Sequence, residues 1–255
     1  MQLRQMPLVC PRGLAALLLL GAITVPAIAQ APPAIRSITH VRIKPDKLGD
    51  WVAAEKDYAA LVKKAGSDRT YTIWAAQTGP REFLLVRYYS KWAEMDVIDD
   101  PKMAEHAGAM AGIIARINAS IESSWREIHS KQPDLTLPRP AEMPKMLRSA
   151  RITVASGKMD EVLATLKANT LPAMKAAGVT AYGVGRVRYG APTNQVLTHT
   201  GFNSWADLDG PTPIEKVAGR DAYLKYVETM NSLTTRTEWT IYRFREDLSY
   251  IAPAK

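Results

Sequence analysis

The sequence repeats itself along its length, and this repeat constrains its fold more than any other feature. Six short matches occur in the same order in both halves, at offsets of 109 to 114 residues. They pair Arg42-Ile43 with Arg151-Ile152, Gly66 with Gly178, Trp92-Ala93 with Trp205-Ala206, Pro101 with Pro213, Trp125 with Trp239 and Asp134-Leu135 with Asp247-Leu248. A period of this length is too long for a solenoid repeat, so the pattern predicts a duplicated domain.

Hydrophobic periodicity changes in the same order within each half. In the first half it predicts a strand, a helix, a hairpin, a second helix and a last strand, over residues 35–44, 48–62, 70–76 with 82–89, 103–121 and 125–128. In the second half the corresponding segments are residues 147–154, a helix that begins with 159–166, 180–189 with 195–202, 223–230 and 238–244. Pro172 is expected to bend or split the helix that contains it. Each half therefore has the β-α-β-β-α-β order of a ferredoxin-like unit.

A proline-rich stretch separates the two halves. It contains Pro133, Pro138, Pro140 and Pro144, and prolines at this density are typical of a linker. The sequence thus predicts a first ferredoxin-like unit at residues 35–130, a linker at 131–145 and a second unit at 146–250.

Both helices of such a unit cover one face of a four-stranded antiparallel sheet, and the other face needs a cover of its own. The chain resembles a tandem fusion of two units of the dimeric α/β-barrel superfamily, which includes antibiotic-biosynthesis-type monooxygenases. The resemblance rests on the element order, the duplication and a Trp-Ala-acid step after the third strand of each unit, at residues 92–94 and 205–207. It implies an α+β fold in which the two sheets pack face to face as an intramolecular barrel, and it implies no catalytic residue.

The first 29 residues have the pattern of a secretory signal peptide. Arg4 and Arg12 precede or flank an apolar run at residues 13–23, and Ala27-Ile28-Ala29 forms a cleavage site before Gln30. We therefore expect a periplasmic or secreted protein with no membrane segment after cleavage. The alternative is an uncleaved anchor, although the apolar run is shorter than the roughly 20 residues that span a bilayer.

Charge and cysteine content exclude several classes of function. Cleavage would lower the net charge from +8 to +6, and no Lys/Arg tract or RNA-binding motif is present, so no nucleic-acid partner is predicted. The single cysteine, Cys10, lies in the signal segment. The exported chain would therefore have no disulfide, no thiol nucleophile and no cysteine-based metal site.

Strand alternation suggests which side chains face away from the helices. We expect these residues to line a cavity between the sheets: His40, Arg42, Trp74, Arg151, Tyr182, Arg186 and His199. The arginines could hold a carboxylate or enolate, the histidines could move a proton, and the aromatic rings could stack on a planar molecule. Alternatively, these residues only form the contact between the two halves, which requires no activity.

No motif for nucleophilic, nucleotide or metal chemistry is present. The sequence lacks G-x-S-x-G, P-loop and Rossmann signatures, and its four histidines lack metal-ligand spacing. No metal or cofactor is predicted, with haem kept as an alternative because some relatives of this fold bind it. Gly183 and Gly185 lie within a strand pattern, where glycine marks a bulge or a close approach of another group.

Two functions remain open on this evidence. The first is a monomeric protein with pseudo-two-fold symmetry that binds a small anionic or aromatic molecule between its sheets. The second is a cofactor-independent monooxygenase or isomerase, with His40 or His199 as the base and Arg42 or Arg151 stabilising an enolate.

Overall fold

The computed structural model describes residues 34–97, 100–140 and 142–253. Pro32–Lys255 forms one compact unit, to which all the described residues belong. The predicted signal peptide and its cleavage site lie outside the described residues. None of the helices within the described part of the chain is both long enough and apolar enough to span a membrane.

The secondary structure follows the predicted order in both halves. The first half contains β1 (Ile35–Ile43), α1 (Leu48–Lys64), β2 (Tyr71–Ala76), β3 (Phe83–Tyr89), η1 (Trp92–Met95), η2 (Pro101–His106), α2 (Ala107–Ser120) and β4 (Ile121–Lys131). After η3 (Pro133–Leu135), the second half contains β5 (Met146–Val154), α3 (Met159–Thr165), η4 (Leu166–Thr170), α4 (Leu171–Ala176), β6 (Tyr182–Tyr189), β7 (Gln195–Phe202), η5 (Trp205–Leu208), α5 (Pro213–Ala218), α6 (Arg220–Leu233), β8 (Thr234–Phe244) and η6 (Glu246–Leu248).

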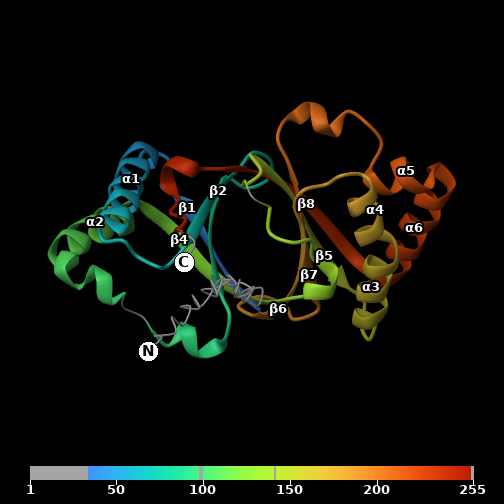
Figure 1. Cartoon of the computed structure of the whole chain (residues 1–255), viewed down its shortest axis with the longest axis horizontal. Helices are drawn as coiled ribbons and strands as arrows, with labels where there is room; N and C mark the ends of the chain where they lie inside the picture. Colours follow the sequence, from blue (N-terminus) through green and yellow to red (C-terminus); the bar gives the residue numbers. More distant parts are fainter. Residues whose placement is uncertain (1–33, 98–99, 141, 254–255) are drawn as a thin grey trace, which may run out of the picture. The chain divides into compact units, whose positions relative to one another are not determined.

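The eight strands form one closed antiparallel barrel in the order β1-β3-β2-β8-β5-β7-β6-β4 (Figure 1). The four strands of each half are neighbours, and the pairs β2–β8 and β4–β6 join the halves. The predicted α+β antiparallel barrel is confirmed, but the half-sheets join edge to edge rather than stacking as two separate sheets. Closure pairs edge strands that would otherwise expose unpaired backbone groups.

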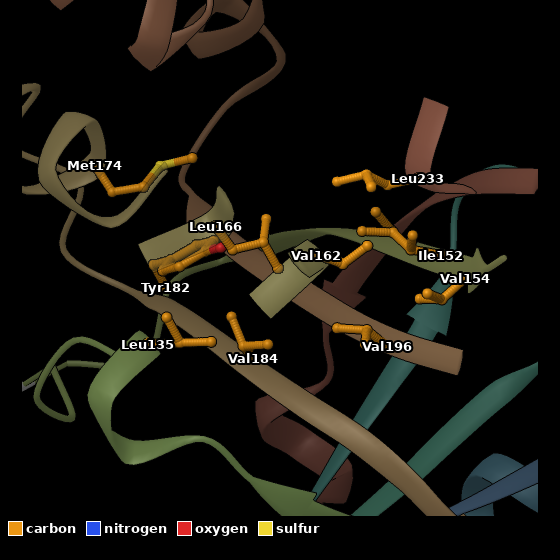
Figure 2. Close-up of a cluster of buried hydrophobic side chains, with 11 residues drawn as sticks. Leu135, Ile152, Val154, Val162, Leu166, Met174, Tyr182, Val184, Val196 and Leu233 are labelled. Atoms are coloured by element: carbon orange, nitrogen blue, oxygen red, sulfur yellow. The ribbon is translucent and has the colours of Figure 1, made fainter. Parts of the chain in front are cut away.

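The helices lie outside the barrel, with α1 and α2 on one side and α3 to α6 on the other (Figure 1). Trp51, Ala54 and Val62 of α1 pack with Ile73 of β2 and their neighbours in one buried cluster. In the second half, Val162 and Leu166 pack over strand residues, as Figure 2 shows. Each half therefore has its own apolar layer between helices and strands.

Glycines end the first helical segment of both halves. Gly66 follows α1 with a φ of 63° and Gly178 follows α4 with a φ of 73°. Glycine adopts this left-handed conformation without steric cost, which is why it terminates helices so often. In the second half, a π-helical turn, η4, comes directly before the turn that contains Pro172 and divides the helix into α3 and α4.

The last strand of each half starts earlier than predicted, directly after its helix. As a result, the matched tryptophans Trp125 and Trp239 do not occupy equivalent positions. Trp125 pairs with His40, and its ring stacks on the His40 ring. Trp239 pairs with Ala150, which belongs to the helix-side cluster of the second half. The two tryptophans thus face opposite sides of the barrel wall. A one-residue difference in register has this effect because side chains alternate along a strand.

Candidate functional site

The inside of the barrel, which we call the lumen, contains an apolar cluster built from both halves. Its buried members are Ile38, Trp74, Leu84, Val86, Val187, Leu197 and Tyr242, and Met143 from the segment between the halves packs against them. The residues that alternate with this cluster belong to the helix-side layers. Membership of the clusters therefore fixes which side chains face the lumen.

Six charged or ionisable side chains form a buried network in the lumen, which we call the lumen network: Arg36, His40, Glu82, Glu127, His129 and Arg151. Glu127 is at its centre and is 2% exposed. Arg151 Nη2 donates to Glu127 Oε1 and Oε2 at 2.9 and 3.0 Å. These bonds compensate for burying the carboxylate, since a buried charge is stable only when it is paired.

His40 lies between two carboxylates. Its Nδ1 is 3.2 Å from Glu82 Oε2, and its Nε2 is 3.4 Å from Glu127 Oε1 without forming a hydrogen bond. Glu82 also accepts a 3.0 Å hydrogen bond from Tyr242. Burial alone would lower the pKa of His40, but Glu127 and Glu82 together outweigh burial and raise it. The raised pKa favours the protonated imidazolium.

His129 is a neutral imidazole with both ring nitrogens occupied. Arg36 Nη2 lies 3.0 Å from His129 Nδ1, and because a guanidinium can only donate, Nδ1 must accept. The proton is therefore on Nε2, which donates to Glu127 Oε2 at 3.0 Å. Complete burial, with the charge of Arg36 in addition, lowers the pKa of His129 to about 4. His129 has no lone pair left with which to act as a base.

His199 differs from the other lumen histidines because neither ring nitrogen has a hydrogen-bond partner. It pairs with Ser149 of β5 and Gly183 of β6, and it alternates along β7 with Leu197 of the lumen cluster. Burial, followed by the charges of Arg36 and Arg151, lowers its pKa well below the usual value. His199 is therefore a neutral ring that can both donate and accept one hydrogen bond.

Comparison with solved structures identifies the architecture. A protein from Lactobacillus acidophilus named "putative monooxygenase" has a TM-score of 0.59 at 11% identity, over 84% of this chain and 94% of that one. A protein of the same description from Fusobacterium nucleatum has a TM-score of 0.57 at 12% identity, over 83% and 92%. An anthrone oxidase-like protein has a TM-score of 0.56 at 12% identity, over 84% and 92%.

The chain has the fold of the dimeric α/β-barrel superfamily. The sequence itself matches no family profile and no curated protein. At these identities the structural likeness establishes the fold and not the activity.

Five of the seven predicted site residues of this α/β barrel are on the lumen side: His40, Arg42, Trp74, Arg151 and His199. Arg42 lies 5.5 Å above the ring of Trp125, which is 37% exposed. The two therefore lie nearer the solvent than His40. The lumen network brings His40 and Arg151 together through Glu127.

Tyr182 and Arg186 do not line the lumen, contrary to the prediction. Tyr182 belongs to the helix-side cluster of the second half, where Figure 2 shows it beside Leu166 and Leu135. Arg186 is two and four residues from Val184 and Tyr182 on β6 and therefore shares their face. The odd-numbered residues of β6, including Gly185 and Val187, face the lumen instead. The two glycines at 183 and 185 concealed this phase in the sequence, because neither carries a side chain that reports its environment.

Sequence analysis missed four members of the lumen network: Arg36, Glu82, Glu127 and His129. Arg36 was detectable, because it alternates in phase with His40 on β1. Glu127 and His129 alternate with Trp125 on β4, but the predicted strand was too short to include them as a set. Their proximity to Arg36 and His40 depends on strand pairing, which one sequence does not reveal.

The lumen is poorly suited to a metal ion. Among the described residues, no group of three or more His, Cys, Asp or Glu side chains could hold a metal ion. His199 has free nitrogens, but the charges of Arg36 and Arg151 act on it. Both arginines would repel a cation placed there. His129 has no free nitrogen that could bind a haem iron.

A second polar place lies on the helix side of the first half. A cavity of about 90 Å³ is lined by Tyr58, Val62, Ser67, Arg69, Tyr71, Arg87, Asp100, Met103 and Met110. Tyr71 lines this cavity, and its hydroxyl group is buried without a hydrogen-bond partner. Oε2 of Glu55, whose charge acts on Tyr71, is also buried without a partner. Burial raises the pKa of Glu55 to about 7, with Arg87 opposing the shift. Orphaned polar atoms beside a cavity of this size are suited to ordered water or a small polar molecule.

Proposed function

We propose that this protein binds a small organic molecule in the barrel lumen, between the lumen network and His199. One observation carries the proposal. Arg36 Nε and both nitrogens of His199 are buried, face the same lumen and have no hydrogen-bond partner. Buried polar groups in native proteins are almost always satisfied, so these atoms call for a partner that the chain does not supply.

A purely structural role explains the lumen network less well. Replacing a buried group of ion pairs by apolar side chains is often neutral or stabilising, so burial of charge by itself is weak support for stability. The same barrel already packs Ile38, Trp74 and Leu84 in an apolar cluster. Clusters of buried groups with shifted pKa values are more typical of functional sites.

An enzymatic role is the second candidate. The observation that favours it is a free imidazole, His199, in the same lumen as a histidine whose two carboxylate neighbours favour the cation, His40. In a monooxygenase- or isomerase-like reaction His199 would accept a proton and His40 would donate one, while Arg36 or Arg151 would stabilise an enolate. The names of the structural neighbours agree with this candidate, although they support only the fold.

Three further proposals concern the whole chain. The matching positions of Gly66 and Gly178 and the equal strand orders in the two halves support a tandem duplication of one ferredoxin-like unit. Closure of the barrel within one chain supports a monomer with pseudo-two-fold symmetry. The signal-like pattern of residues 1–29 supports export to the periplasm or the medium, which N-terminal sequencing for Gln30 would test.

The binding proposal is tested by native mass spectrometry of the protein purified from its own host. We expect a mass in excess of the chain that disappears on denaturation and is absent from the variant His199→Leu. The matched control is the same substitution at His106, His106→Leu, because His106 ends η2 outside the barrel. Identical spectra for the wild type and His199→Leu would contradict the proposal.

A further inference from the structure

We infer that the lumen takes one small anion per chain, such as an aromatic carboxylate or an enolate, with its charged oxygen at His199 and Arg36. This inference rests on the proposed function and specifies the chemical class of the ligand. It follows from the charges in the lumen, from the buried donors without a partner and from the difference between the two halves.

The charges in the lumen do not balance. The lumen side carries three arginines, Arg36, Arg42 and Arg151, and two carboxylates, Glu82 and Glu127. Lys131 adds a further positive charge there, because it pairs with Gly185. Positive charge is therefore in excess in a barrel interior where electrostatic interactions are strong. An anion offsets this excess, whereas a neutral molecule leaves it uncompensated.

The free donors place the anionic oxygen. Arg36 uses Nη2 on His129, while its Nε is buried and unpartnered. His199 presents an N–H from a neutral ring on which the charge of Arg36 acts. An oxyanion at this position would receive a charge-assisted bond from Arg36 and a second bond from His199. Its remaining body would meet the apolar side chains of the lumen cluster.

Gly185 is what allows Arg36 to lie there. A Cβ built at Gly185 would be 2.7 Å from Arg36 Nη2 and 3.4 Å from His129 Cβ. In the first half the residue that corresponds to Gly185 is Trp74. Trp74 pairs with Leu84 on the neighbouring strand, as Gly185 pairs with Leu197. Trp74 fills the space that the guanidinium uses in the second half, so the barrel contains one such donor set.

Isothermal titration calorimetry with three related probes tests the inference: benzoate, phthalate above both of its pKa values, and benzamide. We expect benzoate and phthalate to bind once per chain, and benzoate to bind about tenfold or more tightly than the amide. Arg36→Met and His199→Leu should each weaken benzoate binding by about tenfold or more. Arg148→Met is the matched control, because Arg148 lies over Trp239 on the outer face.

The pH dependence gives an independent test. His40 faces Glu82, Glu127 and the ring of Trp125, with Arg42 above Trp125, Arg151 on Glu127 and Tyr242 on Glu82. Above the raised pKa of His40 the positive charge of the lumen is smaller, so benzoate affinity should fall. The variant His40→Gln should remove this pH dependence of benzoate affinity.

The outcomes separate the two proposals. Tighter binding of benzamide than of either anion, still lost in His199→Leu, would overturn the anionic ligand and leave the lumen site intact. Benzoate binding that Arg36→Met and His199→Leu do not change would overturn the placement of the oxyanion. Failure of all three probes, together with identical native mass spectra for wild type and His199→Leu, would overturn both proposals.

Discussion

The two halves of the barrel place their strands alike and fill the lumen differently. A β-bulge occurs at Arg42/Ile43 in β1 and at Thr153/Val154 in β5, so these bulges align the two strands. Ile43 pairs with Ile121 and Val154 pairs with Thr234, which aligns β4 with β8. By this alignment Arg36, His40, Glu127 and His129 of the first half correspond to Leu147, Arg151, Thr240 and Tyr242 of the second. At three of the four positions the second half has neither a charged side chain nor an imidazole, so the polar network is concentrated on the strands of the first half.

The helix-side layers differ in the same direction. Lys47 and Lys158 each accept the first hydrogen bond of their helix, from Trp51 and Val162. Eight residues further on, the first half has buried Glu55 and the second half has buried Leu166. Because the second half packs Leu166 at this position, the fold does not need the carboxyl group that Glu55 supplies in the first half. The comparison teaches that the ionisable groups of the first half are additions to a scaffold that packs without them.

The largest effect is expected from removing the centre of the lumen network. Glu127→Gln leaves Arg151 and His40 without their shared carboxylate, and an uncompensated buried charge costs about 3–5 kcal/mol. Denaturant unfolding should show a loss of this size. Thr240→Val, at the corresponding position of the second half, should cost less than about 1 kcal/mol. Equal losses for both variants would show that the halves do not differ as described.

A nearly equal effect is expected at Glu55, but it depends on pH. The pKa of Glu55 is raised from 4.5 to about 7, so the folded protein keeps a proton that the unfolded chain releases in between. The free energy of unfolding should therefore fall as pH rises through this window, by about 3 kcal/mol in total. Glu55→Leu copies the second half and should abolish this part of the slope. An unchanged slope between pH 4.5 and 7, measured by urea titration, would refute the assignment.

A smaller effect is expected at Gly185. In Gly185→Ala the added methyl group displaces the Arg36 guanidinium from His129, and overpacking of this kind costs about 1–3 kcal/mol. Gly183→Ala is the control on the same strand and face, because its Cβ would meet Thr136 at an ordinary 3.6 Å. The variant at Gly185 should lose both stability and benzoate affinity. A loss at Gly183 as large as at Gly185 would contradict the close approach.

The smallest effect on stability is expected at Trp125 and Trp239, which the sequence repeat matches but the structure places on opposite faces. Trp125 stacks on His40 with ring centroids 4.4 Å apart, whereas Trp239 is 57% exposed on the outer face. Trp125→Ala should destabilise by about 1–2 kcal/mol and Trp239→Ala by less than about 1 kcal/mol. Trp125→Ala should also alter the NMR titration of His40. Identical unfolding curves for the two variants would argue against the stack.

Local patterns predicted the elements, because alternation, helical spacing and the glycines at 66 and 178 report on short stretches of chain. They also predicted the lumen side of β1, since His40 and Arg42 alternate with Val41 and Ile43. They failed on β6, where glycines hide the phase, and at Trp239, where one residue of register reverses the face. The contacts within the lumen network could not be predicted, because Glu82 and Glu127 meet His40, and Arg151 meets Glu127, only through the pairing of strands that are distant in sequence.

The most direct test of the account is a crystal structure of the protein purified from its own host or soaked with benzoate. We predict electron density for a bound molecule in the barrel, with an oxygen within hydrogen-bond distance of His199 and of Arg36. A lumen in which those nitrogens contact only other side chains or water, with benzoate bound elsewhere or not at all, would contradict it.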